Sequence, residues 1–161
     1  MISLPIFGLA ARGIGQKGVD YTVVTSAHPQ FVGNLNLFPT SRLLFGWLMA
    51  SWRNIEQSPL FEQDSMRLCS QNTQLIKAAG TTPDAGVVLV YAVDGMGTVA
   101  IAGDLFMYDD NLSRLDAAFV WDDVMVQQSR RRIVCLADWL VPGHGVPMPI
   151  SRATKQQAGC S

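Results

Sequence analysis

The order of sequence patterns predicts a layered α/β domain with a mixed or antiparallel sheet. Helical and strand patterns follow one another as helix, strand, helix, several strands, helix and strand. Of the 161 residues, 48% are hydrophobic and 16% are charged, so the chain can bury a substantial core and differs from a disordered protein. We expect one domain over residues 1–150 and a polar tail over residues 151–161 that frays.

The first quarter of the chain predicts two helical segments around one strand. Residues 5–12 can form a short helix that Gly13 ends. The stretch "VDYTVVT" (19–25) has the β-branched residues that are typical of a buried strand. Residues 32–38 then form an apolar turn or short helix, which Pro39 stops.

The middle of the chain predicts short strands. The run "RLLFGWLMAS" (42–51) is continuously apolar, so periodicity does not separate strand from helix there. The next segment, 52–64, is polar and contains a proline, and we expect a surface excursion. Residues 87–93 and 98–102 flank a glycine-rich turn and give the clearest hairpin. Four β-rich runs, separated by turn signals, cover residues 65–69, 73–79, 86–94 and 97–104.

The last third predicts one helix and one strand. An acidic, polar connection (108–123) precedes an amphipathic helix of about three turns, and "DWLV" (138–141) reads as a short strand before the tight loop "PGHG". The basic run Ser129 to Arg132 is interpreted as the solvated start of a helix, with a phosphate-binding patch as the alternative.

Composition and cysteine usage favour an intracellular protein. The net charge is −1, with 12 basic and 13 acidic residues, so no overall field attracts nucleic acid or an anionic membrane. Cys69, Cys135 and Cys160 are odd in number and widely spaced, which favours reduced thiols, and we expect Cys69 and Cys135 in the core. The opening residues lack a basic n-region and are interpreted as domain sequence, and no apolar run is long enough to span a membrane. The expected location is the cytoplasm, with the nucleus as the alternative.

Three side chains that can bind metals fall at junctions between strands and loops. His28 follows the first predicted strand, Asp104 follows the second strand of the hairpin, and His144 follows the last strand. Gly143 and Gly145 leave the backbone free to present the His144 imidazole. Each residue alone also fits an ordinary loop position, so none of them indicates a metal site by itself.

Three segments together resemble the metallo-β-lactamase superfamily, and within it a small single-domain animal branch. They are "VVTSAHPQFVGNLNLFP", "GTVAIAGDLF" and "SRRRIVCLADWLVPGHG", and the resemblance runs from residue 8 to residue 148. It implies an αββα sandwich with a zinc site at one edge, where the metal activates water for hydrolysis. Members of this branch are associated with endoribonucleolytic processing of histone pre-messenger RNA, and more distant relatives hydrolyse thioesters and β-lactams. Fold resemblance alone does not choose a substrate.

The resemblance also implies which residues stand at the metal-ligand positions. The first motif, HxHxDH after a threonine, falls on residues 25–31, and a later histidine position falls in "AAGTTPD". Asp104 matches the bridging aspartate and His144 matches the last histidine. The remaining positions carry Ser26, His28, Gln30, Phe31 and Thr81.

These replacements predict that the hydrolytic site is dismantled. A catalytic zinc needs about three ligands from His, Asp, Glu or Cys and one open position for water. Ser26 and Thr81 are at most weak neutral ligands, and Phe31 fills the second metal's space with apolar volume. Gln30 lacks the carboxylate that orients the attacking water in the family.

Three hypotheses follow for the function. The favoured one is a non-catalytic protein of this fold that acts through binding or dimerisation. The second is a residual hydrolase with one zinc ion, held by His28, Asp104 and His144. The third is a fragment without function.

The resemblance also bears on the partners that we expect. Family domains begin with several strands, whereas this sequence begins at the helix before the first motif. We therefore expect a partial domain with an open sheet edge, covered by a second copy of the chain or by another protein. RNA is implied as a partner only through the resemblance, and no membrane is expected.

Overall fold

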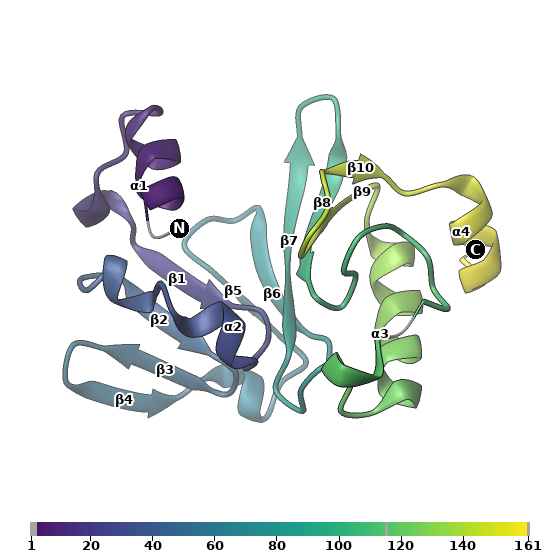
Figure 1. Cartoon of the computed structure of the whole chain (residues 1–161), viewed down its shortest axis with the longest axis horizontal. Coiled ribbons are helices and arrows are strands. Elements are labelled where there is room, and N and C mark those ends of the chain that lie inside the picture. Colours follow the sequence, from purple (N-terminus) through teal and green to yellow (C-terminus); the bar gives the residue numbers. More distant parts are fainter. Residues whose placement is uncertain (1–2, 115, 161) are drawn as a thin grey trace.

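The computed structural model describes residues 3–114 and 116–160, which form two β-sheets with helices beside them (Figure 1). In the four-stranded sheet, β1 and β2 are parallel and the other neighbours are antiparallel. Its order is β1-β2-β3-β4, with β1 at Tyr21–Val24, β2 at Arg42–Phe45, β3 at Leu48–Ser51 and β4 at Asn54–Gln57.

The six-stranded sheet has the order β10-β9-β8-β7-β6-β5, and only β8 and β9 are parallel. Its strands are β5 (Ser65–Arg67), β6 (Thr73–Lys77), β7 (Gly86–Val93), β8 (Gly97–Gly103), β9 (Trp139–Pro142) and β10 (Met148–Pro149). The predicted α/β class and the hairpin of residues 87–93 and 98–102 are both confirmed.

Within the described residues, four α-helices and four 3-10 helices complete the fold. Helices α3 and α4 lie on the side of the six-stranded sheet that faces away from the four-stranded sheet (Figure 1). The α-helices are α1 (Ser3–Ala10), α2 (Pro29–Val32), α3 (Asp123–Leu136) and α4 (Arg152–Ala158). The 3-10 helices are η1 (Gln16–Gly18), η2 (Leu35–Leu37), η3 (Pro59–Phe61) and η4 (Ala117–Phe119).

Strand β7 links the two parts of the hydrophobic core, because successive side chains of a strand point to opposite faces. Val87 and Leu89 belong to the cluster that also contains Val126 and Ile133 of α3. Val88 belongs to the cluster between the sheets, with Leu44 of β2 and Leu75 of β6. Apolar residues therefore fill both faces of β7, which explains its nearly continuous hydrophobic sequence.

The apolar run 42–51 is a β-hairpin, and the segment after it is only partly the expected surface excursion. Gly46 has a φ of 57° between β2 and β3, a conformation that favours glycine. Residues 54–57 then form β4, which pairs antiparallel with β3. All four β4 residues are exposed because the strand stands at the sheet edge, so their polarity resembles that of a loop.

The edge of the four-stranded sheet carries exposed apolar side chains. Trp52 is 83% exposed and Ile55 is 72% exposed, and Leu48 is half exposed. The prediction that a second chain covers an open sheet edge remains a prediction. Among the described helices, none has the length and apolar character that crossing a membrane requires.

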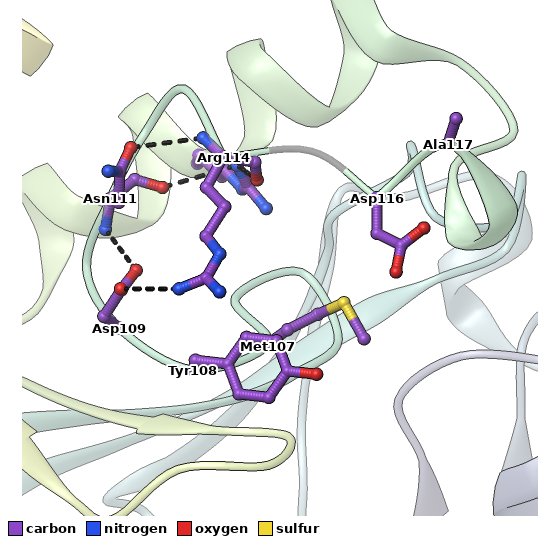
Figure 2. Close-up of a pocket in the computed structure, with 8 residues that line it drawn as sticks. Met107, Tyr108, Asp109, Asn111, Arg114, Asp116 and Ala117 are labelled. Carbon is purple, nitrogen blue, oxygen red and sulfur yellow. Dashed lines mark hydrogen bonds and ion pairs between the residues drawn. The ribbon is translucent and has the colours of Figure 1, made fainter.

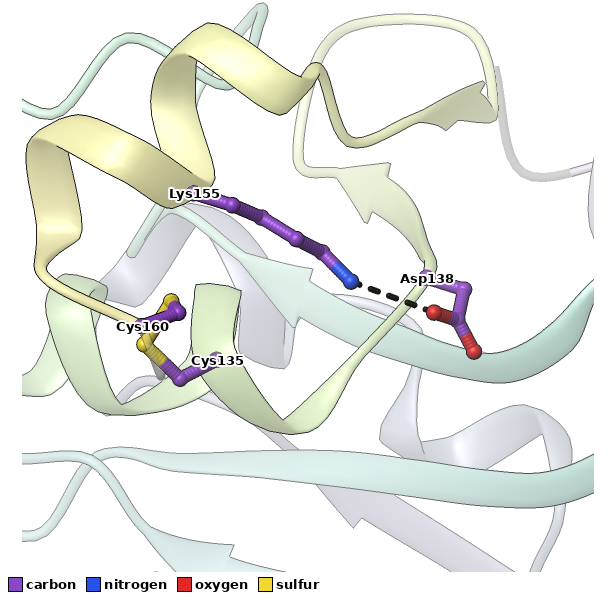
Figure 3. The surroundings of a disulfide bond; sticks show 4 residues. All are labelled: Cys135, Asp138, Lys155 and Cys160. Atoms are coloured by element: carbon purple, nitrogen blue, oxygen red, sulfur yellow. Dashed lines mark hydrogen bonds and ion pairs between the residues drawn. A yellow bond between two sulfur atoms is a disulfide. The ribbon is translucent and has the colours of Figure 1, made fainter.

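The C-terminal tail does not fray, contrary to the expectation from its polarity. Residues 152–158 form α4, whose N-cap Ser151 accepts a hydrogen bond from the Thr154 N–H at 3.0 Å. Lys155 Nζ donates to Asp138 Oδ1 at 3.1 Å, and Figure 3 shows this pair beside the disulfide that joins α4 to α3. The division of the chain into a domain and a tail at residue 150 stays a prediction.

The cysteine predictions are wrong, except that Cys69 is a free thiol. Cys135 and Cys160 form a disulfide between α3 and the end of α4, so they are not reduced thiols. Cys69 is free but exposed, and Cys135 is exposed as well, so neither is a core residue. Apolar neighbours in sequence misled the prediction, because they do not say which face of an element a residue occupies.

Loss of the disulfide is expected to destabilise the chain by about 3.5 kcal/mol, since the bond closes a loop with a sequence separation of 25. The double substitution Cys135→Ser and Cys160→Ser tests this by urea denaturation. The matched control is Cys69→Ser, an exposed position where we expect a change within about 0.5 kcal/mol. Equal unfolding free energies in the double variant and the control would contradict the expectation.

Candidate functional site

The structure brings Asp104 and His144 together at one edge of the six-stranded sheet. Asp104 directly follows β8 and His144 lies two residues after β9, and these parallel neighbours end at the same edge. His144 Nε2 lies 3.3 Å from Asp104 Oδ1. The Asp104 side chain is buried, whereas the His144 side chain is 42% exposed. The pair therefore joins a carboxylate in the protein interior to an imidazole that solvent can reach.

Two glycines let the backbone approach Asp104 closely. A Cβ atom at Gly143 would collide with Asp104 Oδ1, and Gly103 has a φ of 52°. The Gly143 N–H donates to the carbonyls of Gly103 and Phe106, both at 3.0 Å. These contacts fix the "PGHG" loop against the end of β8, so side chains larger than glycine would separate Asp104 from His144.

His28 follows β1 and stands at the N-cap of α2. Its Nε2 atom is buried and has no hydrogen-bond partner within the described residues. The imidazole packs edge-on against Phe31 and Phe119, with ring centroids 6.5 Å and 5.6 Å away. The Phe31 ring also lies 6.5 Å from the His144 ring. A phenyl ring therefore neighbours both histidines of the chain.

Ser26 and Thr81 are brought together although they lie far apart in the sequence. Both side chains are buried, and Thr81 Oγ1 donates a hydrogen bond to Ser26 Oγ at 3.4 Å. Each hydroxyl therefore finds a polar partner inside the protein. The side chain of Gln30 lies outside the described part of the structure.

Arg130 holds the loop that follows Asp104. The run 129–132 lies inside α3 rather than at its start, and Arg131 and Arg132 are exposed as predicted, whereas Arg130 is buried. Its side chain is almost fully buried in α3. Nε donates to the Leu105 carbonyl at 2.6 Å. Nη1 donates to three further carbonyls, those of Leu112 at 3.0 Å, Arg114 at 2.6 Å and Asn111 at 3.4 Å. Removal from water lowers the pKa of Arg130 to about 10, although the nearby Asp109 charge opposes this shift.

The same loop forms one wall of a pocket of about 320 Å³ (Figure 2). Arg114 Nη1 pairs with Asp109 Oδ2 at 3.2 Å, and the Arg114 guanidinium lies over the Tyr108 ring, 4.7 Å from its centroid. The Tyr108 and His144 ring centroids are 5.8 Å apart, so the pocket adjoins the Asp104 and His144 pair. The lining residues are Met107, Tyr108, Asp109, Asn111, Arg114, Asp116, Ala117 and Arg130.

Sequence reasoning missed this pocket, although one signal pointed to Arg130. The buried positions of α3 are Val126, Arg130, Ile133 and Val134, which follow the helical repeat. Arg130 is therefore on the core-facing side of the helix, whereas the run of three arginines suggested solvent. Nothing in the sequence indicated that Arg114 and Asp116 share a pocket.

The described chain resembles several solved structures. A probable metal-dependent hydrolase from Staphylococcus aureus matches with a TM-score of 0.71 at 11% identity, covering 92% of this chain and 64% of that one. A protein of Thermotoga maritima assigned to the metallo-β-lactamases matches with a TM-score of 0.64 at 17% identity, covering 91% and 78%. AidC, a dizinc quorum-quenching lactonase, matches with a TM-score of 0.62 at 15% identity, covering 87% and 62%. At these identities the matches establish the fold alone.

Curated relatives agree with these structures, whereas no family model matches the chain. An uncharacterized protein of Caenorhabditis elegans, C03F11.2, is 32% identical over 160 residues, covering 98% of this chain and 44% of that protein. Human metallo-β-lactamase domain-containing protein 1 is 31% identical over 150 residues, covering 92% of this chain and 55% of the human protein.

The chain belongs to the metallo-β-lactamase superfamily. The resemblance seen in the sequence and the expected metallo-β-lactamase-like fold are both confirmed. The chain spans about half the length of the curated relatives that it matches.

The residues present do not fit the two-metal centre of a dizinc metallo-β-lactamase-fold enzyme. Across residues 3–114 and 116–160, no group of three or more His, Cys, Asp or Glu side chains could hold a metal ion. Phe31 lies beside both imidazoles, and Ser26 and Thr81 bond to each other. Whether His28, Asp104 and His144 bind a single metal ion stays a prediction.

Replacing Arg130 by methionine is expected to destabilise the fold by about 3 kcal/mol or more, because buried carbonyls of the pocket loop lose their donor. Urea denaturation of Arg130→Met measures this loss. The matched control is the adjacent, exposed Arg131→Met, for which we expect a change within about 0.5 kcal/mol. Similar losses in both variants would show that the carbonyl contacts contribute little.

Asp110 gives a pH-dependent prediction. Burial alone would raise its pKa, but hydrogen bonds from the Ser151 N–H and Thr154 Oγ1 outweigh burial and hold the pKa below its ordinary value of 3.8. A depressed pKa contributes stability above pH 3.8 that is lost as the pH falls through the folded-state pKa. The unfolding free energy of Asp110→Ala should therefore lie below that of the unmodified chain at pH 7, and the gap should narrow below pH 3.8. A gap of constant size from pH 7 to pH 3 would contradict this cause.

Proposed function

We propose that this chain is a non-catalytic binding protein of the metallo-β-lactamase superfamily rather than a zinc-dependent hydrolase. The observation that carries the proposal is the position of Phe31, whose ring lies 6.5 Å from the rings of both His28 and His144. A phenyl ring donates no lone pair to a metal, and it places apolar volume where the family resemblance expects a ligand.

The second support is the polar pair of Ser26 and Thr81. Both residues stand at positions where the family resemblance expects histidines. Their hydroxyls bond to each other in a buried environment, so neither needs a metal to satisfy its hydrogen-bonding capacity. Together with Phe31, they account for three ligand positions without a strong ligand.

The chemistry of a metal-assisted hydrolase explains why these losses matter. Zinc lowers the pKa of its bound water toward neutrality, and this supplies the attacking hydroxide. The present chain offers Asp104 and His144 as a contact pair and His28 beside Phe31. These groups can still bind and orient a polar ligand through hydrogen bonds.

The names of the relatives do not decide between binding and hydrolysis. AidC is described as a dizinc lactonase, and human metallo-β-lactamase domain-containing protein 1 is named for its domain. The endoribonuclease activity that the sequence resemblance implies is, in this proposal, absent from the present chain. Binding through a second copy of the chain remains part of the proposal, with the exposed β4 edge as the surface concerned.

The second candidate function is a hydrolase with a single metal ion at His28, Asp104 and His144. The 3.3 Å contact between Asp104 and His144 favours it, because these two side chains already converge. It requires Phe31 to move so that His28 joins them, and zinc-to-ligand distances of roughly 2.0–2.2 Å would then be expected.

Metal analysis of the purified chain, with assays on thioester, lactam and RNA substrates, tests the proposal. We expect substoichiometric zinc after dialysis and no turnover. A restored variant, carrying Ser26→His, Gln30→Asp, Phe31→His and Thr81→His, supplies the positive control and should retain zinc. Stoichiometric zinc in the unmodified chain, with turnover lost in Asp104→Ala, would overturn the proposal and support the hydrolase with one ion.

A further inference from the structure

We infer that the pocket between Arg114 and Asp116 binds a small zwitterion, specifically a free α-amino acid with an apolar side chain. The inference rests on the proposed function, because it names the ligand class of a binding protein. The pocket volume of about 320 Å³ is at the low end of the range of roughly 300–1,000 Å³ for ligand pockets. A molecule the size of one amino acid therefore suits it.

Arg114 supplies the positive wall of the pocket. Among the described residues, its guanidinium makes one side-chain hydrogen bond, from Nη1 to Asp109 Oδ2. A guanidinium carries five N–H donors in a planar fork, so donors remain for a ligand carboxylate. The guanidinium carbon lies 4.7 Å from the Tyr108 ring centroid, and this cation–π contact uses none of those donors.

Asp116 supplies the negative wall. Its Oδ1 accepts the Ala118 N–H at 3.1 Å and so caps η4. Figure 2 shows the Asp116 carboxylate on the side of the opening across from the Arg114 guanidinium. A ligand ammonium group beside Asp116 would place its three N–H donors against carboxylate oxygen.

Apolar groups complete the pocket between the charged walls. The Tyr108 ring and the Met107 thioether lie below the opening in Figure 2, and Ala117 also lines the pocket. Aromatic rings and thioethers make favourable contacts with apolar and aromatic side chains. The ligand side chain is therefore expected to be apolar, with a flat ring as the best match to Tyr108.

Charges of both signs select against ligands with a single charge. A simple carboxylate that pairs with Arg114 also meets Asp109 and Asp116, whereas a simple amine beside Asp116 also meets Arg114 and Arg130. Like charges that share one pocket repel each other. A zwitterion satisfies both walls at once.

The positive wall is held in place by backbone contacts. The Arg114 N–H donates to Asn111 Oδ1 at 3.1 Å, and the Arg114 carbonyl accepts from Arg130 Nη1 at 2.6 Å. These bonds fix the main chain of Arg114, and the contacts with Asp109 and the Tyr108 ring then orient its guanidinium toward the pocket. Preorganisation of this kind lowers the entropic cost of binding.

Calorimetric titration of the full chain with three matched probes tests the inference. The probes are L-phenylalanine, which is zwitterionic, phenethylamine, which lacks the carboxylate, and 3-phenylpropanoate, which lacks the ammonium. We expect L-phenylalanine to bind about tenfold or more tightly than either of the others, because each lacks one charged hydrogen-bonding group. Equal affinity for all three probes, or no binding of L-phenylalanine, would overturn the inference.

Two substitutions test which charged residue binds which charged group of the ligand. Arg114→Gln should reduce the affinity for L-phenylalanine to about that of phenethylamine, and Asp116→Asn should reduce it to about that of 3-phenylpropanoate. Asn at 116 keeps an oxygen that can accept the Ala118 N–H, and Arg131→Gln on the exposed side of α3 is the control that should leave binding unchanged. Circular dichroism confirms that each variant is folded, and unchanged affinity in both folded wall variants would overturn the assignment.

The outcomes also separate this inference from the proposed function. Stoichiometric zinc with turnover would overturn the proposed function, whatever the titrations show. Lack of a zwitterion preference in a metal-free chain without turnover would overturn the inference alone.

Discussion

The guanidinium of Arg130 is the interaction on which the site depends. Burying a cation without a hydrogen-bonded carboxylate is costly, and Arg130 offsets that cost with backbone carbonyls from residues 105–114. Those carbonyls belong to the segment that leaves Asp104 and forms the pocket. One side chain of α3 thus sets the path of the chain between the sheet edge and η4. The polar loop lies over the core because its carbonyls have donors there.

The loop is also held from its outer side, through α4. Asp110 Oδ2 accepts from the Ser151 N–H and from Thr154 Oγ1, and its neighbours Asp109 and Asn111 line the pocket. The disulfide between Cys135 and Cys160 joins α4 to the same helix that carries Arg130. Two consecutive helices therefore position one irregular segment, and this arrangement gives the pocket loop a defined shape without regular secondary structure.

Much of the fold was predictable because its signals are local. The β-branched runs and the glycine-rich turn at residues 94–97 specify β7 and β8 by their own sequence, and the motif strings placed Asp104 and His144 at strand ends. The misassigned elements are those whose surroundings decide their state. Strand β4 is polar because it is an edge, α4 is stable because it is capped and cross-linked, and Arg130 is buried because carbonyls far along the chain surround it. Composition does not encode contacts of that kind, and at Arg130 the run of three arginines obscured the helical repeat that placed this residue on the core-facing side of α3.

The hydrogen bond between Ser26 and Thr81 bears on whether folding at this edge of the domain needs a metal ion. Where ligand side chains depend on a metal, part of the folding free energy comes from the ion, and the fold then responds to the supply of that ion. Here two hydroxyls satisfy each other inside the protein, and the Phe31 ring packs beside His28. Under the proposed non-catalytic function, folding of this edge of the domain draws on ordinary packing and hydrogen bonding, and we expect chelators to leave it intact.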